Sequence, residues 1–292
     1  MKHFRLLLAT ALFIFGFSSS HAQTTAQDAS AIPTTMIIQS GFNHKNYQLN
    51  VSLPKNYSTK DSLRYPVLYV LDGKYSYKSF SSIREMLDLA NEIENVIIVT
   101  IEGNASSESD WLISRHTDYT PTPVPKADTL WEKILKLKPG VLKSGGADAF
   151  LNTLKKDIIP SVDRQYKTTN NRGLFGHSLG GLFAAYCLLT SPELFNRYSI
   201  NSPSFWWNDQ ELLALERSFT MSHESLSAQI FMSVGSLEGP MMVTPMTNFA
   251  NALKARNYNG VTLTTQIFDS ETHVSVVPAA SSRTLKVLYR FR

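Results

Sequence analysis

The sequence is poor in cysteine, since Cys187 is the only one among 292 residues. A single cysteine cannot form an intramolecular disulfide, so packing alone must stabilise the folded chain. No Cys–His metal spacing surrounds it, and two leucines follow it directly. We predict that Cys187 is a core residue, because free cysteine is among the most buried residue types.

Long apolar runs are also lacking, except at the start of the chain. Residues 6–17 are largely apolar, with Lys2 and Arg5 before them and small residues up to Ala22 behind them. Twelve residues are too few to span a bilayer, and this order of zones is typical of a secretory signal peptide. We predict a signal peptide at 1–22 that is cleaved after Ala22. The protein would then be secreted or periplasmic, without stable membrane insertion.

The excess of positive over negative charge is small. The sequence has 28 Lys and Arg against 24 Asp and Glu, a formal net charge of +4 that falls to +2 without residues 1–22. No basic run is interleaved with aromatic residues, so the sequence predicts no nucleic-acid partner. Nothing in it is expected to concentrate positive charge for a strongly anionic ligand.

The 270 residues after the signal peptide fit one domain. Residues 23–35 are mostly small and polar and predict a flexible leader, and 36–292 form the domain. Alternating strands and helices predict an α/β fold with a mostly parallel sheet covered on both faces. Residues 104–146 break this rhythm with Ser, Pro and Gly, which predicts an inserted loop or lid. The predicted strands are 46–54, 65–73, 95–103, 172–176, 198–202, 229–235 and 261–269, and the predicted helices are 76–93, 146–166, 178–190, 209–219, 244–258 and 274–291.

Residues 176–180, GHSLG, fit the pattern G-x-S-x-G. They lie between a predicted strand and a predicted helix, where this motif places a nucleophilic serine on a strained turn. Small flanking residues avoid collisions, and Gly181 would let the helix pack closely. We predict that Ser178 is a nucleophile; a purely structural turn is the alternative.

A nucleophilic serine needs a base, and in this arrangement the chain order is Ser, then Asp or Glu, then His. Of the histidines beyond the signal peptide, only His273 follows the last predicted strand. We predict that His273 accepts the proton of Ser178. The alternative is a helix-capping or surface histidine.

The acid that orients this base should follow the preceding strand. Glu238 stands there, in the segment FMSVGSLEGP, and would fix the tautomer of His273 and stabilise its cation. Asp209, one strand earlier, is the competing candidate, whereas Asp269 and Glu271 are too close to His273 in sequence.

Donors for an oxyanion are expected from two places. One is the amide of Leu179, directly after the nucleophile, and the other is an amide after an early central strand. The segment VLDGKYSY supplies the second, from Gly73 or Lys74, and the sequence leaves this choice open. Asp72 is expected to be a turn residue whose side chain bonds nearby backbone.

Six segments stand in a fixed order between about residue 36 and the end of the chain. They are YVLDG, SRHTDYTPT, FGHSLGGLFAAYCLLTSPELF, INSPSFWW, VGSLEG and THVSV. Together they resemble the putative-esterase group of α/β-hydrolases, which includes enterobactin, salmochelin and bacillibactin esterases, S-formylglutathione hydrolases, feruloyl esterases and mycolyltransferases. The similarity is greatest to the siderophore-esterase branch. It implies the α/β-hydrolase fold and ester hydrolysis, and it matches Ser178, Glu238 and His273 to the triad.

Two further segments are candidates for substrate contact. Arg115 in RHTDYTPT could meet an anionic or polar substrate group, or could form a clamp with Asp118 that holds the insert down. Trp206 and Trp207 in SFWW could form an aromatic wall beside the serine, with core packing of one of them as the alternative.

The sequence therefore predicts an exported serine esterase that hydrolyses a carboxylic ester through an acyl-enzyme. The substrate would be a small-molecule or glycan ester, and no metal or organic cofactor is expected. An acyltransferase would use the same residues, and a peptidase is also compatible with the fold. A non-catalytic binding protein with a vestigial triad is a further alternative.

Overall fold

The computed structural model describes residues 34–103 and 105–291. The predicted signal peptide, and the predicted leader as far as residue 33, lie outside these ranges. In the part of the chain that is described, no helix has the length and apolar character needed to cross a membrane.

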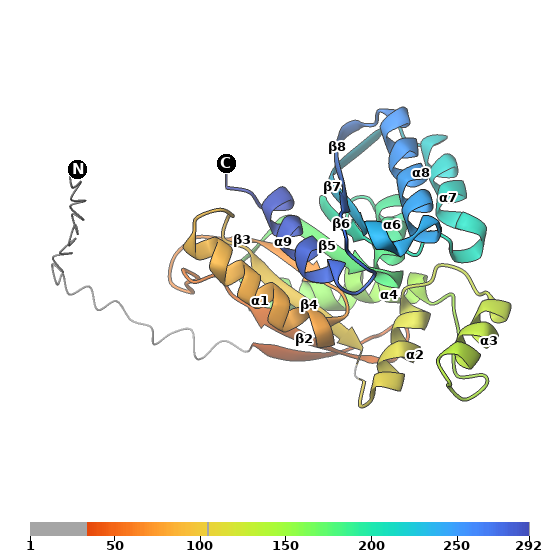
Figure 1. Ribbon diagram of the computed structural model, residues 1–292. Helices are drawn as coiled ribbons and strands as arrows, with labels where there is room; N and C mark the ends of the chain where they lie inside the picture. Colours follow the sequence, from red (N-terminus) through yellow and green to blue (C-terminus); the bar gives the residue numbers. More distant parts are fainter. Residues whose placement is uncertain (1–33, 104, 292) are drawn as a thin grey trace, which may run out of the picture.

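An eight-stranded sheet runs through the domain (Figure 1). Its strands are β1 (Thr35–Gln39), β2 (Asn46–Ser52), β3 (Tyr65–Val70), β4 (Ile97–Gly103), β5 (Thr168–His177), β6 (Arg197–Asn201), β7 (Ser225–Gly235) and β8 (Asn259–Phe268). They lie in the order β1-β2-β4-β3-β5-β6-β7-β8. Strand β2 is antiparallel to both of its neighbours, and the other neighbouring strands are parallel. The predicted mostly parallel sheet is confirmed.

Helices cover both faces of this sheet (Figure 1). They are α1 (Gly73–Leu89), α4 (Ala147–Thr153), α5 (Ile159–Gln165), α6 (Leu179–Thr190), α7 (Glu211–Thr220), α8 (Pro240–Arg256) and α9 (Val276–Leu288). Successive side chains of a strand point to opposite faces. In β3, Val67 and Tyr69 therefore join a large core cluster with α4 to α8, whereas Leu68 and Val70 pack with α1 and α9. Cys187 is fully buried in the larger cluster, as predicted.

The insert at 104–146 is not a plain loop. It contains two helices, α2 (Glu108–Asp118) and α3 (Pro125–Ile134). Ser107 begins α2 with a capping box, and α3 begins with a proline at its first helical position. The Ser and Pro residues that predicted a loop thus mark the starts of helices.

Two other elements differ from the sequence prediction. Strand β1 was not predicted, and its first residue, Thr35, was assigned to the leader. It is an edge strand with partly exposed side chains, so its apolar pattern is weak. The predicted helix at 146–166 is divided by a π-helical turn at Leu154–Ile158. Pro160 is the second residue after this turn, and its missing amide hydrogen leaves a carbonyl of the preceding turn without its usual helical donor.

The carboxyl ends of β3, β5, β6, β7 and β8 meet at one edge of the sheet, which we call the carboxyl edge; the opposite one is the amino edge. Open α/β sheets bind ligands beyond the carboxyl ends of their strands. The segments that follow these five strands carry Asp72, Ser178, Ser202, Glu238 and His273, respectively.

Candidate active site

Ser178 occupies the sharp turn between β5 and α6. Its backbone has φ 62° and ψ −122°, a strained conformation for a residue with a side chain. Its amide donates to the carbonyl of Asn201 at 3.0 Å, and its carbonyl accepts from the amide of Leu182 at 3.1 Å. This is the geometry expected of the serine in a G-x-S-x-G turn.

The glycines around this turn differ in how much space a side chain would have. A Cβ added at Gly176 would lie 1.9 Å from the carbonyl oxygen of Gly180, so no side chain fits there. A Cβ at Gly181 would lie 2.9 Å from the carbonyl oxygen of Asn201. At Gly180 the nearest atoms would be 3.5 Å away, an ordinary contact. The close approach that the pattern assigns to its second glycine therefore falls on Gly181.

His273 and Glu238 form a hydrogen-bonded pair at the carboxyl edge. His273 lies in the loop after β8, and Glu238 ends the short 3-10 helix Ser236–Glu238 after β7. Their Nδ1 and Oε2 atoms are 2.6 Å apart. The side chain of Glu238 is fully buried, whereas that of His273 is 41% exposed. The imidazole is thus accessible while its acid partner is not.

Three donors hold the carboxylate of Glu238. Its Oε1 accepts from the hydroxyl of Ser202 at 2.6 Å and from the amide of Gly235 at 2.7 Å, and His273 bonds its Oε2. Burial raises the pKa of Glu238, but these hydrogen bonds outweigh it and leave the pKa below its ordinary value. An ionised Glu238 keeps a proton on Nδ1 of His273, so that Nε2 can accept another. Asp209, the competing acid, is exposed on the 3-10 turn after β6.

The hydroxyl of Ser178 has a polar neighbour in Ser204, whose Oγ lies 3.5 Å from its own. In the described ranges, no hydrogen bond joins Ser178 to His273. The residue before the serine, His177, does contact His273, because their ring centroids are 4.6 Å apart. Catalytic hydrogen bonds are often long before substrate binds. The structure therefore gathers the three predicted residues at one edge without bonding the serine to the histidine.

The predicted oxyanion donors lie at two helix starts. Leu179 is the first residue of α6, and Gly73 and Lys74 are the first two of α1. Amides of a first helical turn have no acceptor within their helix and lie at the positive end of its dipole. A Cβ at Gly73 would lie 3.2 Å from the backbone of Ile101, so this helix start packs closely against β4. The choice between Gly73 and Lys74 stays a prediction.

Arg115 forms a clamp, but not with the partner considered from the sequence. Its Nε donates to Oδ1 of Asp72 at 2.9 Å and its Nη2 to Oδ2 at 3.1 Å. Trp111 also donates to Asp72, at 3.2 Å. Asp118 instead bonds Lys45 at 2.7 Å. The expectation that Asp72 bonds only nearby backbone is therefore wrong, because its carboxylate joins β3 to helix α2.

The two tryptophans of SFWW have separate environments. Trp207 is 1% exposed and lies in the core, edge-on to His116, so the expectation that it contacts substrate is not supported. Trp206 is half-buried, and its ring lies 6.0 Å from that of Trp131 in α3. Of the two tryptophans, Trp206 is therefore the one whose side chain is partly exposed.

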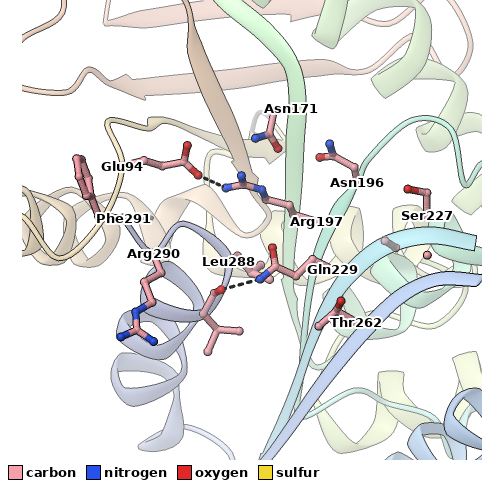
Figure 2. Close-up of a pocket in the computed structure, with 13 residues that line it drawn as sticks. Glu94, Asn171, Asn196, Arg197, Ser227, Gln229, Thr262, Leu288, Arg290 and Phe291 are labelled. Atoms are coloured by element: carbon pink, nitrogen blue, oxygen red, sulfur yellow. Dashed lines mark hydrogen bonds and ion pairs between the residues drawn. The ribbon is translucent and has the colours of Figure 1, made fainter.

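A large hollow lies away from this site, at the amino edge (Figure 2). It measures about 730 Å³ and is lined by the starts of β6, β7 and β8 together with the end of α9. Arg197 forms an ion pair with Glu94 there, and Gln229 donates to the carbonyl of Val287 at 2.8 Å. The hollow contains none of the residues predicted to act in catalysis.

Comparison with known proteins agrees with this architecture. The model of the family described as "Putative esterase" matches residues 40–274. The ferri-bacillibactin esterase BesA of Bacillus subtilis is 28% identical over 269 residues, which is 89% of this chain and 91% of that protein. The structure of the BES protein from Bacillus cereus is 29% identical with a TM-score of 0.73, over 88% of this chain and 96% of that one. An IroE-like serine hydrolase from Shewanella oneidensis is 26% identical with a TM-score of 0.74, over 87% and 79%. The predicted α/β-hydrolase fold is confirmed.

Proposed function

The chain belongs to the "Putative esterase" family and is a serine hydrolase of carboxylic esters, and from this premise we propose that Ser178, His273 and Glu238 carry out the reaction. The observation that carries the proposal is the buried, ionised Glu238 that holds Nδ1 of His273 at 2.6 Å, on the same sheet edge as the strained Ser178. This is the arrangement by which a weak hydroxyl nucleophile is activated.

In the proposed reaction, Nε2 of His273 takes the proton of Ser178 while Oγ attacks the ester carbonyl. Glu238 stabilises the imidazolium that forms. The amide of Leu179 and that of Gly73 or Lys74 would bind the oxyanion. His273 then returns the proton to the departing alcohol, which leaves an acyl-enzyme. Water, deprotonated by His273, hydrolyses it and restores Ser178.

Covalent labelling tests this assignment. A fluorophosphonate should modify the folded protein at Ser178, and peptide mass spectrometry identifies the labelled residue. Labelling should be lost in Ser178→Ala and strongly slowed in His273→Gln. A probe that attached to another serine, or that labelled Ser178→Ala at the wild-type rate, would refute the proposed nucleophile.

We further propose that the substrate is a siderophore ester; the relative BesA is named a ferri-bacillibactin esterase. The fold supports this with a concentration of positive charge that the sequence was not expected to have. We call residues 125–143 the lysine hairpin, because all five of its lysines are exposed: Lys126, Lys133, Lys136, Lys138 and Lys143. Ferric catecholates are anionic and aromatic, so exposed ammonium groups beside a half-buried tryptophan suit them.

The acidic residues of the lysine hairpin do not offset these lysines on its surface. Asp128 bonds Nε2 of His116 at 2.7 Å, and the buried Glu132 accepts the amide of Leu142 at 2.9 Å. Trp131, on the same helix, faces Trp206 at 6.0 Å between ring centroids. The hairpin therefore lies against the partly exposed tryptophan of the SFWW segment.

A substrate panel tests the proposed ester. Purified protein should hydrolyse a ferric catecholate trilactone with a higher kcat/KM than feruloyl, acetyl-sugar or short acyl esters. Salt should lower that kcat/KM more than it lowers hydrolysis of a neutral ester. Equal rates and equal salt dependence across the panel would contradict the siderophore assignment.

Export is proposed from the sequence alone. The protein is expected to be secreted or periplasmic after cleavage behind Ala22. Amino-terminal sequencing of the protein from its native host should begin at Gln23. An amino terminus that retains residues 1–22 would contradict it.

A further inference from the structure

His177, the second residue of the GHSLG motif, has no part in the mechanism above, yet its ring lies against the base. It is the last residue of β5, and its main-chain carbonyl accepts from Nη2 of Arg115 at 3.4 Å. Its ring centroid is 4.6 Å from that of His273, and the two planes are inclined by 39°. The pair therefore packs ring against ring on the side of His273 that faces the nucleophile turn.

The surroundings of His177 keep its ring neutral. Burial is the main cause that lowers its pKa to about 3, and the neighbouring His273 and Arg115 lower it further. The carboxylate of Glu238 and a hydrogen bond to the main chain of His273 oppose this shift.

The geometry of the contact is that of ring packing. Nδ1 of His177 is buried and has no hydrogen-bond partner. The neutral imidazole of His177 therefore meets the base through its ring face.

We propose that His177 is a positioning residue that holds His273 with Nε2 toward Ser178. The base needs such support because it lies in a loop, is 41% exposed and is otherwise held at Nδ1 by Glu238. A neutral ring can pack against His273 without repelling the imidazolium, whereas a lysine or arginine could not. The inference rests on the proposed triad.

Three variants separate the contribution of the ring from that of its polar nitrogens. His177→Phe keeps a ring and loses the nitrogens, His177→Asn keeps a polar group and loses the ring, and His177→Ala loses both. We expect kcat to fall by about 10- to 100-fold in His177→Ala and less in the other two, because small misplacements of a catalytic group cost this much. KM should stay within about twofold, since no substrate contact is removed.

A spectroscopic signature distinguishes positioning from general stability. The low-field proton resonance of the Glu238–His273 hydrogen bond should broaden or disappear in His177→Ala. It should be unaffected in the control His223→Ala, which removes a histidine stacked on Phe219 at 4.0 Å near the start of β7. If His177→Ala does not fold, the two larger replacements carry the comparison.

The proposal is overturned if all folded His177 variants keep the wild-type kcat and the low-field resonance. It is equally overturned if kcat falls only in proportion to the folded fraction. Failure of the triad itself looks different, because Ser178→Ala would then remain active. A dead Ser178→Ala beside fully active His177 variants would refute this inference alone.

Discussion

The two edges of the sheet differ in where the backbone is strained. At the carboxyl edge, the parallel strands β3, β5, β6 and β8 are each followed by a non-glycine residue with positive φ: Asp72 at 57°, Ser178 at 62°, Ser202 at 40° and Ser270 at 59°. Each such residue costs on the order of 1–3 kcal/mol. At the amino edge, Asn91 and Asn257 have positive φ in the connections before β4 and β8, and among the residues that line the hollow of Figure 2 only Gly260 does.

Polar groups are arranged differently at the two edges as well. The amino edge has an open hollow in which Arg197 pairs with Glu94. The carboxyl edge holds an accessible imidazole on a buried carboxylate, beside a serine with strained backbone. This constellation, rather than the open hollow, marks the edge where we place catalysis. Changes there should affect rate, and changes at the amino edge should affect stability.

The largest expected effect is that of Ser178→Ala. Removing the nucleophile should lower kcat by roughly 10⁴–10⁶-fold, since loss of a triad serine leaves only binding and oxyanion stabilisation. Hydrolysis of a p-nitrophenyl acyl ester measures it, with circular dichroism as a check on folding. Retention of the wild-type rate would show that the strained turn is not where the chemistry occurs.

Glu238→Gln should have the next largest effect. An amide can present its N–H to Nδ1 of His273 and so favour the wrong tautomer, and kcat should fall by about 10²–10⁴-fold. The matched control is Asp209→Asn, at the exposed competing acid, which should leave kcat unchanged. Equal losses in the two variants, or a larger loss at position 209, would reverse the assignment of the acid.

The same carboxylate should make stability depend on pH. The pKa of Glu238 is lowered in the folded state. Its contribution to the free energy of unfolding is therefore fully present above the pKa of an unfolded glutamate, about 4.3, and is lost as pH falls through the folded-state pKa. The difference in Tm between wild type and Glu238→Gln should therefore shrink as pH falls below about 4.3. Thermal unfolding between pH 3 and 7 measures it, and a constant difference would contradict the lowered pKa.

Two glycine variants test whether close contacts, rather than the G-x-S-x-G pattern itself, require glycine at the turn. Gly176→Ala should destabilise the fold or distort the turn, because its Cβ would lie 1.9 Å from the carbonyl oxygen of Gly180. Gly180→Ala meets its nearest neighbours at 3.5 Å and should keep a Tm close to wild type. Thermal unfolding of both variants is the measurement, and equal Tm losses would show that the pattern, not the contact, sets the requirement.

Much of this arrangement could be predicted from the sequence, because strand order fixes which loops share an edge. The positions of Ser178, Glu238 and His273 followed from a motif and from the order of strands along the chain. The partner of Arg115 did not, because Asp72 is 43 residues away and the pairing depends on how the insert folds. The burial of Trp207 could not be predicted either. A segment of four residues such as SFWW is too short for a periodic pattern that would tell which ring points into the core.

Some signals were present in the sequence and pointed to another structure. The capping serine at 107 and the proline at 125 start helices α2 and α3, but within a Ser- and Pro-rich segment they favoured a loop. The five lysines of the lysine hairpin were visible too. That Asp128 and Glu132 bond inward and leave these exposed lysines without acidic partners in the segment is specified only by the folded chain.

The smallest expected effect lies at the amino edge and completes the comparison. Glu94→Gln removes the ion pair with Arg197, whose guanidinium also stacks on the ring of Tyr289 at 4.3 Å. Because the Glu94 side chain is 34% exposed, the loss of unfolding free energy should be no more than about 1 kcal/mol. The kcat should not change, because no residue of this hollow belongs to the proposed triad. Urea denaturation and ester hydrolysis of the same preparation measure both quantities, and a fall in kcat without a fall in stability would mean that the amino edge contributes to catalysis.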